Sequence, residues 1–373
     1  MIYSAPILLT LYGDALRDGA VRVSDRRIVD AGKRDVLKRK YPSEEERHFE
    51  GTALMPGLIN GHTHLEDGFL RQRLPYSGNP SDWVRAYQEK KRELSTAEGM
   101  NFAHLGVLES LNNGTTTILD VSSTGASFQV LFNERVRSVI FLEFLPAPRE
   151  TEETAFNRTL SKAEGFMANE LSNWGVALHP PGGAGAGLFR RCAAYAREQN
   201  VFTLCHALGA PGPWAPGHPL PRKTVVIHGP SPGEEDLTRL SEAAATVVLC
   251  PRSFMRFREG PFPLRRLLES GVNVCLGTES LALSDSLDMF EEMYWLKRLV
   301  PELSGRAILR LVVHGGARAM GLQGVLGQIR PGFLADIIGV RVNTLDPDFI
   351  CDALVTEEVE IRFVMVNGRE VLS

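Results

Sequence analysis

The chain contains the run Leu54-Met55-Pro56-Gly57-Leu58-Ile59-Asn60-Gly61-His62-Thr63-His64, in which an apolar segment leads to two histidines two residues apart. Side chains alternate between the two faces of an extended segment, so His62 and His64 point to the same side. Two imidazoles on one side of a backbone can share a divalent metal ion, and imidazole suits zinc, iron and nickel. Two polar residues in a turn are the alternative, and the downstream sequence favours the metal.

Strand-like and helix-like segments alternate along the middle of the chain. Helical periodicity marks stretches such as Leu188 to Glu198 and Glu234 to Ala243. Eight segments rich in β-branched residues are expected to be strands: 54–59, 115–121, 136–145, 174–179, 201–206, 224–228, 245–250 and 272–277. Eight strands alternating with helices, over a length near the roughly 250 residues typical of this fold, predict an α/β chain with a (β/α)8 TIM barrel.

The two ends of the chain have a different pattern. Residues 19–34 and 48–53 have the character of short β segments, and Val366-Asn367-Gly368-Arg369 contains the turn residues of a hairpin. We therefore expect a small β-sandwich domain made of residues 1–54 and 324–373, packed beside a barrel of residues 55–323.

Composition limits the classes of protein and partner. Of the 373 residues, 43% are hydrophobic and 23% are charged, which is ordinary for a globular protein. The net charge of −4 gives no reason to expect nucleic acid or an anionic membrane as partner. No apolar run reaches the roughly 18 residues of a membrane span, and the short apolar N-terminus lacks a basic leader. Five cysteines without Cys-x-x-Cys spacing are expected to be buried free thiols, so we predict a cytoplasmic protein.

Titratable side chains gather at the carboxyl ends of the predicted strands, where the active sites of TIM barrels lie. Glu279 stands just beyond the eighth strand, and five of the nine histidines lie at strand ends: His62, His64, His179, His206 and His228. The other four are interpreted as surface or packing residues: His48, His104, His218 and His314. Two histidines from strand one, one from strand five and a carboxylate from strand eight suit a single catalytic metal with an open water position. That predicted ligand set is His62, His64, His206 and Glu279.

Separated motifs along the chain resemble the amidohydrolase superfamily. They are Met55-Pro56-Gly57-Leu58-Ile59-Asn60-Gly61-His62-Thr63-His64-Leu65-Glu66, Asn113-Gly114-Thr115-Thr116-Thr117, Cys250-Pro251-Arg252-Ser253, Gly277-Thr278-Glu279-Ser280 and Gly332-Phe333-Leu334-Ala335-Asp336. The branch resembled holds cytosine, S-adenosylhomocysteine and aminofutalosine deaminases and triazine chlorohydrolases. The run from Leu281 to Met293 is most similar to the aminofutalosine deaminase-like members.

The resemblance implies a metal-dependent hydrolase that cleaves a C–N bond of a small cyclic or purine-like substrate, by deamination or amide-type hydrolysis. One divalent ion would be held by the predicted ligand set, with zinc expected and iron as the alternative. Such an ion lowers the pKa of its bound water from ~15.7 to about 7. His228 would hydrogen-bond the attacking water, and His179 would contact the substrate. The resemblance also implies a homodimer.

Departures from the family pattern surround the same pocket. Relatives carry His-x-x-Glu at strand five, and Gly209 stands where the Glu shuttles the proton. Losing a positioned acid–base typically costs about 10²–10⁴-fold in rate. Glu279 replaces the usual Asp and is one methylene longer, which displaces its carboxylate by roughly 1.5 Å. Phe254 stands where Asn is common, residues 182–187 form a glycine-rich loop, and prolines crowd residues 211–221, which predicts an irregular crossover and a shortened lid.

Two hypotheses follow from these departures. In the first, the protein is an active hydrolase in which another carboxylate replaces the missing acid. Glu66 is the leading candidate because it continues the alternation of His62 and His64 if the strand remains extended. Glu279 could also serve if it binds the metal loosely, and Glu143 is a weaker candidate for a substrate contact. In the second, the protein is a catalytically degenerate barrel that binds a small molecule or a partner without turnover. The retained histidines favour the first hypothesis.

Other functional motifs are weaker. The glycines of residues 182–187 follow a strand, but they do not form Gly-x-Gly-x-x-Gly, so a dinucleotide site is disfavoured. The chain has no Gly-x-Ser-x-Gly elbow of a serine hydrolase. Arg252, Arg256 and Arg258 could contact an anion, although a solvated basic loop is the favoured interpretation.

Overall fold

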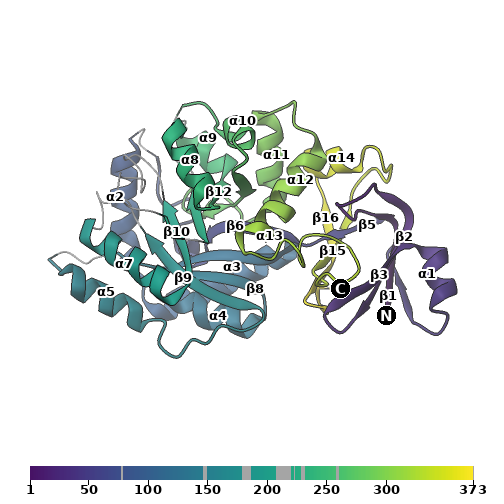
Figure 1. Cartoon of the computed structure of the whole chain (residues 1–373), viewed down its shortest axis with the longest axis horizontal. Helices are drawn as coiled ribbons and strands as arrows, with labels where there is room; N and C mark the ends of the chain where they lie inside the picture. The colour runs from purple at the N-terminus through teal and green to yellow at the C-terminus, as the bar shows by residue number, and fades with distance from the viewer. Residues whose placement is uncertain are drawn as a thin grey trace. The chain divides into compact units, whose positions relative to one another are not determined.

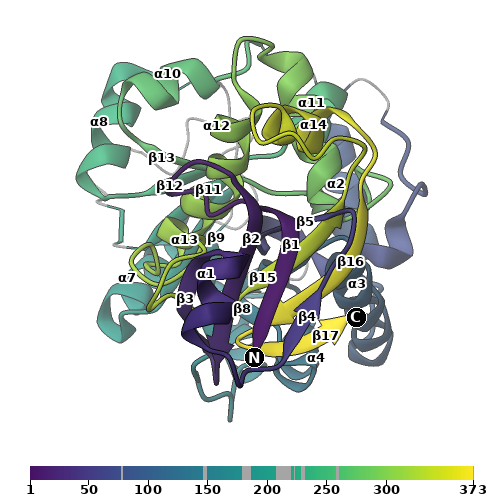
Figure 2. The ribbon, with the colours of Figure 1, turned by 90° about the vertical axis from the view of Figure 1, so that its right-hand side faces the viewer.

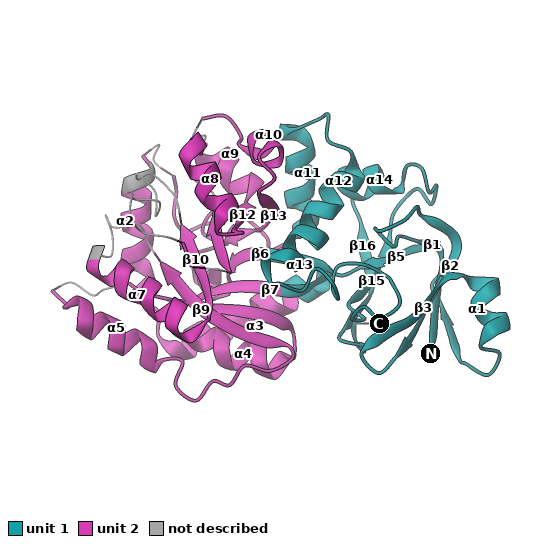
Figure 3. Ribbon diagram, viewed as in Figure 1, with its two compact units in different colours: residues 1–60, 109–117, 288–373 teal, residues 61–108, 118–287 magenta. Residues whose placement is uncertain are grey.

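The computed structural model describes residues 1–76, 79–145, 149–178, 186–206, 220–221, 223–227, 232–257 and 260–372. The chain divides into two compact units, coloured in Figure 3. Unit 1 comprises residues 1–60, 109–117 and 288–373, and unit 2 comprises residues 61–108 and 118–287. Both termini belong to unit 1, which also includes the segment from residue 288 onward, and the domain boundaries at residues 54 and 324 stay predictions.

Unit 1 is built on a mixed β-sheet that combines strands from both ends of the chain (Figure 2). Its strand order is β17-β16-β15-β5-β1-β2-β3, and β4 pairs with β1. The strands are β1 (Ile2–Leu8), β2 (Leu16–Ser24), β3 (Arg27–Lys33), β4 (Glu46–His48), β5 (Thr52–Pro56), β15 (Ile337–Arg341), β16 (Glu360–Val366) and β17 (Arg369–Leu372). The helical segments are α1 (Arg34–Lys40), α11 (Met289–Leu299), α12 (Gly305–Arg310), η2 (Leu311–Gly315), α13 (Gly316–Ala319) and α14 (Ile350–Thr356).

The predicted C-terminal hairpin is confirmed. β16 and β17 are antiparallel, and the turn residues Asn367 and Gly368 have φ values of 51° and 76°. Two-residue hairpin turns require such positive values, which Asn and Gly adopt most readily. In the same sheet β5 is buried at every position and lies between β1 and β15. The sandwich expected from the two ends stays a prediction, since the terminal strands join a single sheet.

Unit 2 contains most of a nine-stranded sheet whose strands alternate with helices (Figure 1). The order is β13-β12-β11-β10-β9-β8-β7-β6-β14, and the pairings from β8 to β13 and between β14 and β6 are parallel. The strands are β6 (Leu58–His64), β7 (Thr115–Ser122), β8 (Arg137–Glu143), β9 (Ser172–Leu178), β10 (Phe202–His206), β11 (Thr224–Ile227), β12 (Thr246–Leu249), β13 (Asn273–Leu276) and β14 (Glu279–Ser280). The helical segments are η1 (Leu65–Leu70), α2 (Pro80–Lys91), α3 (Thr96–Asn112), α4 (Ala126–Glu134), α5 (Glu152–Ser161), α7 (Ala186–Gln199), α8 (Glu234–Glu242), α9 (Pro251–Phe257) and α10 (Leu264–Glu269).

The two edges of this sheet are consecutive in the chain. β13 ends at Leu276 at one end of the strand order, and β14 begins at Glu279 at the other end. Between them, Gly277 N donates to Leu249 O and Thr278 N donates to His62 O. Since only Gly277 and Thr278 connect the two edge strands, the sheet must curl so that its edges come close together, as in β/α barrels. The carboxyl ends of its parallel strands consequently face a common site.

The sequence located most of these elements. Seven of the eight predicted strands lie within two residues of observed ones, and both predicted helices are confirmed as α7 and α8. The prediction of one strand over 54–59 was wrong, because β5 ends at Pro56 and β6 begins at Leu58 in a different sheet. The chain switches sheets at Gly57, whose N donates to Asp336 O, while Leu58 N donates to Gly114 O.

Two further expectations concern burial and membranes. All five cysteines are buried and free, as predicted. Among the helices that the structure describes, none combines the length and the apolar character needed to cross a membrane. Of the proline-rich crossover of residues 211–221, the structure describes only Leu220 and Pro221, and the rest lies outside the described residues.

Candidate metal centre

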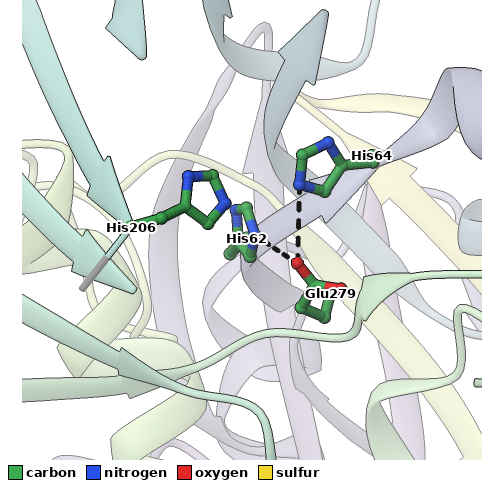
Figure 4. Close-up of side chains that lie close together, drawn as sticks. All are labelled: His62, His64, His206 and Glu279. Carbon is green, nitrogen blue, oxygen red and sulfur yellow. Dashed lines mark hydrogen bonds and ion pairs between the residues drawn. The ribbon is translucent and has the colours of Figure 1, made fainter. Parts of the chain in front are cut away.

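Four buried side chains of unit 2 converge from three strands (Figure 4). His62 and His64 belong to β6, His206 is the last residue of β10, and Glu279 is the first residue of β14. One donor atom from each lies within 4.8 Å of the others. Glu279 Oε1 is 3.3 Å from His62 Nε2 and 3.5 Å from His64 Nε2. The structure thus brings together the four ligands that the sequence predicted.

Local backbone structure explains how these side chains meet. β6 remains extended through His64, so the alternation of side chains turns His62 and His64 to one face. β14 pairs with β6 so that Glu279 lies opposite Thr63, whose Oγ1 donates to Glu279 O at 3.2 Å. Glu279 has a φ of 58°, a left-handed value that is uncommon for a residue with a Cβ atom. Its second oxygen, Oε2, accepts a hydrogen bond from Ser280 N at 2.8 Å.

The charges of the cluster are coupled. Burial alone would raise the pKa of Glu279, but its hydrogen bonds with His62 and His64 and their charges hold that pKa well below the usual range. Burial and the charge of Lys91 would lower the pKa of His64, and the carboxylates of Glu279 and Asp67 raise it overall. Three imidazoles and one carboxylate in a buried space are a donor set that suits a divalent transition metal such as zinc. The residues therefore fit the group that the sequence implied.

A charged network beside His64 was missed by the sequence analysis. Lys91, the last residue of α2, is 3% exposed. Its Nζ lies 2.7 Å from Glu143 Oε2, 3.6 Å from Asp67 Oδ1 and 3.2 Å from His64 Nδ1. Lys91 Nζ also donates to Tyr87 OH at 3.2 Å, and Tyr87 OH donates to Asp67 Oδ2. Burial would lower the pKa of Lys91, but the charges of Asp67 and Glu143 outweigh it and raise the pKa above its ordinary value.

Glu143, which the sequence suggested as a substrate contact, lies in this network. It is the last residue of β8 and is almost fully buried. Besides the ion pair with Lys91, its Oε2 accepts a hydrogen bond from Ser123 Oγ. Glu143 is thereby linked to His64 through a single side chain, that of Lys91.

The structural reason for choosing Glu66 as the replacement acid was wrong. β6 ends at His64, and the 3-10 helix η1 begins at Leu65, so the alternation does not continue to residue 66. The buried Glu66 carboxylate instead accepts hydrogen bonds from Ser123 N at 3.0 Å and Thr124 N at 2.9 Å. Further donors to it are Ser122 Oγ, Ser127 N and Ser127 Oγ. Glu66 holds the segment between β7 and α4.

The remaining candidates are divided between described and undescribed parts of the chain. Four single candidates lie outside the described residues: His179, Gly209, His228 and Arg258. Residues 182–185 of the glycine-rich loop also lie outside them. Arg252 is not part of a merely solvated loop, because it donates from Nη1 to Ser286 Oγ at 2.9 Å and from Nη2 to Ser286 O at 2.8 Å. Arg256 Nη1 donates to Leu283 O at 3.2 Å. These two arginines hold the segment that follows β14.

Comparison with known proteins agrees with this geometry. The sequence model of the amidohydrolase family matches residues 53–371. The chain is 28% identical to a 5-methylthioadenosine/S-adenosylhomocysteine deaminase of Nitratidesulfovibrio vulgaris (strain DP4), over 90% of this chain and 82% of the relative. It is 26% identical to an aminodeoxyfutalosine deaminase of Deinococcus radiodurans, over 86% of this chain and 85% of the relative. A solved adenosine deaminase from Xanthomonas campestris with bound zinc has a similar fold, with a TM-score of 0.87, 22% identity and coverage of 100% of this chain and 92% of that one.

Proposed function

Because this chain belongs to the amidohydrolase family, we propose that it is a metal-dependent hydrolase of C–N bonds that deaminates a small purine-like substrate. The observation that carries the proposal is the buried convergence of His62, His64, His206 and Glu279. The two relatives named above are deaminases of 5-methylthioadenosine/S-adenosylhomocysteine and of aminodeoxyfutalosine, which supports the choice of substrate class.

Each residue of the cluster has a role in this proposal. His62, His64, His206 and Glu279 would hold one divalent ion, with zinc as the first candidate and iron as the second. When bound, such an ion supplies hydroxide at neutral pH. His228 would hydrogen-bond the attacking water and His179 would contact the substrate, two assignments that rest on the sequence alone. The four donors are buried, which strengthens their electrostatic attraction for a divalent ion.

Proton transfer needs a group other than the missing glutamate at position 209. Glu66 is held by five donors of the segment between β7 and α4, which leaves Glu279 as the proposed carboxylate. Hydrogen bonds with His62 and His64 hold its pKa well below the usual range, so its carboxylate is ionised at neutral pH, and it would exchange the proton if it binds the ion loosely. Glu143, paired with Lys91, is proposed to contact the substrate.

Several features of the architecture also belong to the proposal. We propose that the curled sheet is a complete (β/α)8 barrel formed from residues 55–323. Its edges being joined by only two residues supports this closure. Residues 1–54 and 324–373 would form the β-sandwich domain. A cytoplasmic location and a homodimer complete the proposal.

The test measures metal content first and turnover second. Protein purified without added metal or chelator is expected to contain about one zinc or iron per chain by inductively coupled plasma mass spectrometry. Ammonia release is then followed with adenosine, 5-methylthioadenosine, S-adenosylhomocysteine and aminodeoxyfutalosine. His206→Ala serves as the variant that removes one proposed ligand, and an exposed histidine, His104→Ala, serves as its control.

The outcomes separate the two hypotheses. Bound metal with ammonia release that His206→Ala abolishes supports the hydrolase. Bound metal without turnover on the panel and on other amidines, amides and lactams would favour the degenerate barrel. Absence of metal after incubation with zinc, manganese and iron(II) would refute the proposed centre.

A further inference from the structure

The two ring nitrogens of His64 face different surroundings. Nε2 points toward Glu279 Oε1, as the dashed line in Figure 4 shows, and belongs to the proposed metal site. Nδ1 points toward Lys91 Nζ at 3.2 Å. Histidines that bind a metal almost always donate their second N–H to a carboxylate, a backbone carbonyl or water. In this protein that position is taken by a lysine.

The hydrogen-bonding capacity of the two groups makes this contact incompatible with metal binding. A lysine ammonium has three donors and no acceptor, so it can approach His64 Nδ1 only if that nitrogen offers its lone pair. A neutral imidazole whose Nε2 lone pair binds a metal carries its proton on Nδ1. Two donors would then face each other across 3.2 Å. The Lys91–His64 hydrogen bond and a metal ion on His64 Nε2 therefore exclude each other.

Lys91 has another acceptor within reach. Asp67 Oδ1 is buried and, among the residues that the structure describes, has no hydrogen-bond partner. Lys91 Nζ lies 3.6 Å from this oxygen, a few tenths of an ångström beyond hydrogen-bond distance. The ion pair with Glu143 Oε2 at 2.7 Å would remain as a fixed point during such a shift. The network thus offers the ammonium a second position that frees His64.

We propose that Lys91 is a positioning residue that competes with the metal for His64 and moves to Asp67 Oδ1 when the ion binds. This inference rests on the proposed metal-dependent function. Lys91 then lowers the affinity of the centre for its metal. Replacing it by a residue that can accept a hydrogen bond from His64 Nδ1 gives tighter metal binding.

Three substitutions at one position separate the hydrogen bond from the charge. Lys91→Gln removes the charge and supplies an acceptor for His64 Nδ1. Lys91→Met removes the charge and supplies only a weak thioether acceptor, and Lys91→Arg keeps both the charge and the donor-only character. Lys90→Gln, on the exposed neighbouring position of α2, is the matched control for loss of one charge. The affinity for zinc is measured on the full-length protein by competition with a chromophoric chelator.

The expected order of zinc affinity is Lys91→Gln tightest, Lys91→Met second, and wild type, Lys91→Arg and Lys90→Gln weakest. Partners of metal ligands typically change affinity by about 10–100-fold, so the Gln variant is expected to bind at least about tenfold more tightly than wild type. Thermal unfolding in chelator checks that each variant is folded. If Lys91→Met fails to fold, it is replaced in the comparison by the double variant Lys91→Met/Glu143→Gln, which removes both charges of the buried ion pair.

Other orders overturn the inference. Weaker zinc binding by the Gln and Met variants would show that Lys91 prepares His64 for the metal. Equal affinities of the Gln and Met variants would show that only the charge of Lys91 acts. A wild-type protein that binds no zinc, manganese or iron(II) would overturn the proposed function together with this inference, whereas metal binding in the wrong order overturns the role of Lys91 alone.

Discussion

Substitution of Glu66 by Gln tests whether this residue stabilises the fold or takes part in catalysis. Its Oε2 accepts from two backbone N–H groups, those of Ser123 and Thr124, and its Oε1 accepts from Ser127 N at 3.3 Å and from the hydroxyls of Ser122 and Ser127. A glutamine side chain has one oxygen that accepts hydrogen bonds and one NH2 group that donates them. Backbone N–H groups can only donate, whereas the serine hydroxyls can also accept. The amide oxygen is therefore expected to stay with Ser123 and Thr124, and the NH2 group to face Ser127.

The free-energy change follows from this count. The Ser127 N–H would face a donor in a buried place, which costs about 1–3 kcal/mol. The other two N–H groups would lose the charge of their acceptor, at about 0.5–1 kcal/mol each. We therefore expect Glu66→Gln to lower the free energy of unfolding by about 2–5 kcal/mol, which for a chain of 373 residues corresponds to a Tm lower by roughly 3–6 °C. Glu66→Ala leaves all these donors unpaired and is expected to lower Tm further.

The assay combines differential scanning calorimetry with metal analysis and turnover. Glu66→Gln is expected to melt at lower temperature, to bind as much metal as wild type, and to keep its turnover within about threefold when assayed well below its Tm. The opposite pattern would refute the reasoning. If Tm were unchanged and turnover fell about 100-fold or more, Glu66 would be the replacement acid after all.

Three further predictions concern the centre and its surroundings. Glu279→Ala removes the proposed carboxylate ligand, which lies 3.3 Å from His62 Nε2, so zinc affinity measured by equilibrium dialysis is expected to fall by about 100-fold or more, and an unchanged affinity would contradict the ligand assignment. Gly277→Ala places a Cβ 2.7 Å from His62 N, so we expect lower Tm and lower metal content than wild type, and retention of both would contradict the close approach. Burial raises the pKa of Asp120 to about 7, whereas its pKa in the unfolded chain is about 3.9. Between these two pH values the unfolded state ionises while the folded state stays protonated, so the free energy of unfolding decreases as pH rises. Asp120→Asn lacks this penalty and should gain about 2 kcal/mol more over wild type at pH 8 than at pH 5.5 in denaturant unfolding with chelator; a pH-independent difference would rule out that titration.

The proposed metal ligands could be predicted because each depends on local sequence plus one general rule. A run of β-branched residues predicted the strand that carries His206, and the alternation of side chains in an extended segment predicted that His62 and His64 share one face. The chain order of a β/α barrel then placed the ends of these strands, and Glu279, around one site. The same reasoning found the C-terminal hairpin, since Asn367 and Gly368 are the residues that tolerate positive φ.

The failure at Glu66 has a physical cause that the local sequence does not contain. Alternation predicts the direction of a side chain only while the strand remains extended. At Leu65 the backbone N–H donates to Asp120 Oδ1 at 2.7 Å, a contact with a residue 55 positions away, and η1 begins there. The sequence gives no sign of this partner.

Lys91 escaped prediction for a similar reason. It lies in the run Lys90-Lys91-Arg92, in which three cations follow one another with no apolar pattern to tell them apart. The side chain of Lys90 is about half exposed and pairs with Glu93, whereas that of Lys91 is buried against Asp67 and Glu143. Only the tertiary structure makes one of these lysines a neighbour of the metal ligands.

The balance of charge in the cluster and its network supports a bound cation. Among the described side chains of the cluster and its network, the carboxylates of Glu279, Asp67 and Glu143 face one lysine, Lys91, so the local charge is −2 when the histidines are neutral. Unpaired buried charge is costly, and a divalent cation among the four donors would compensate for it. The excess of buried carboxylates therefore supports the proposal that the four donors hold a divalent ion.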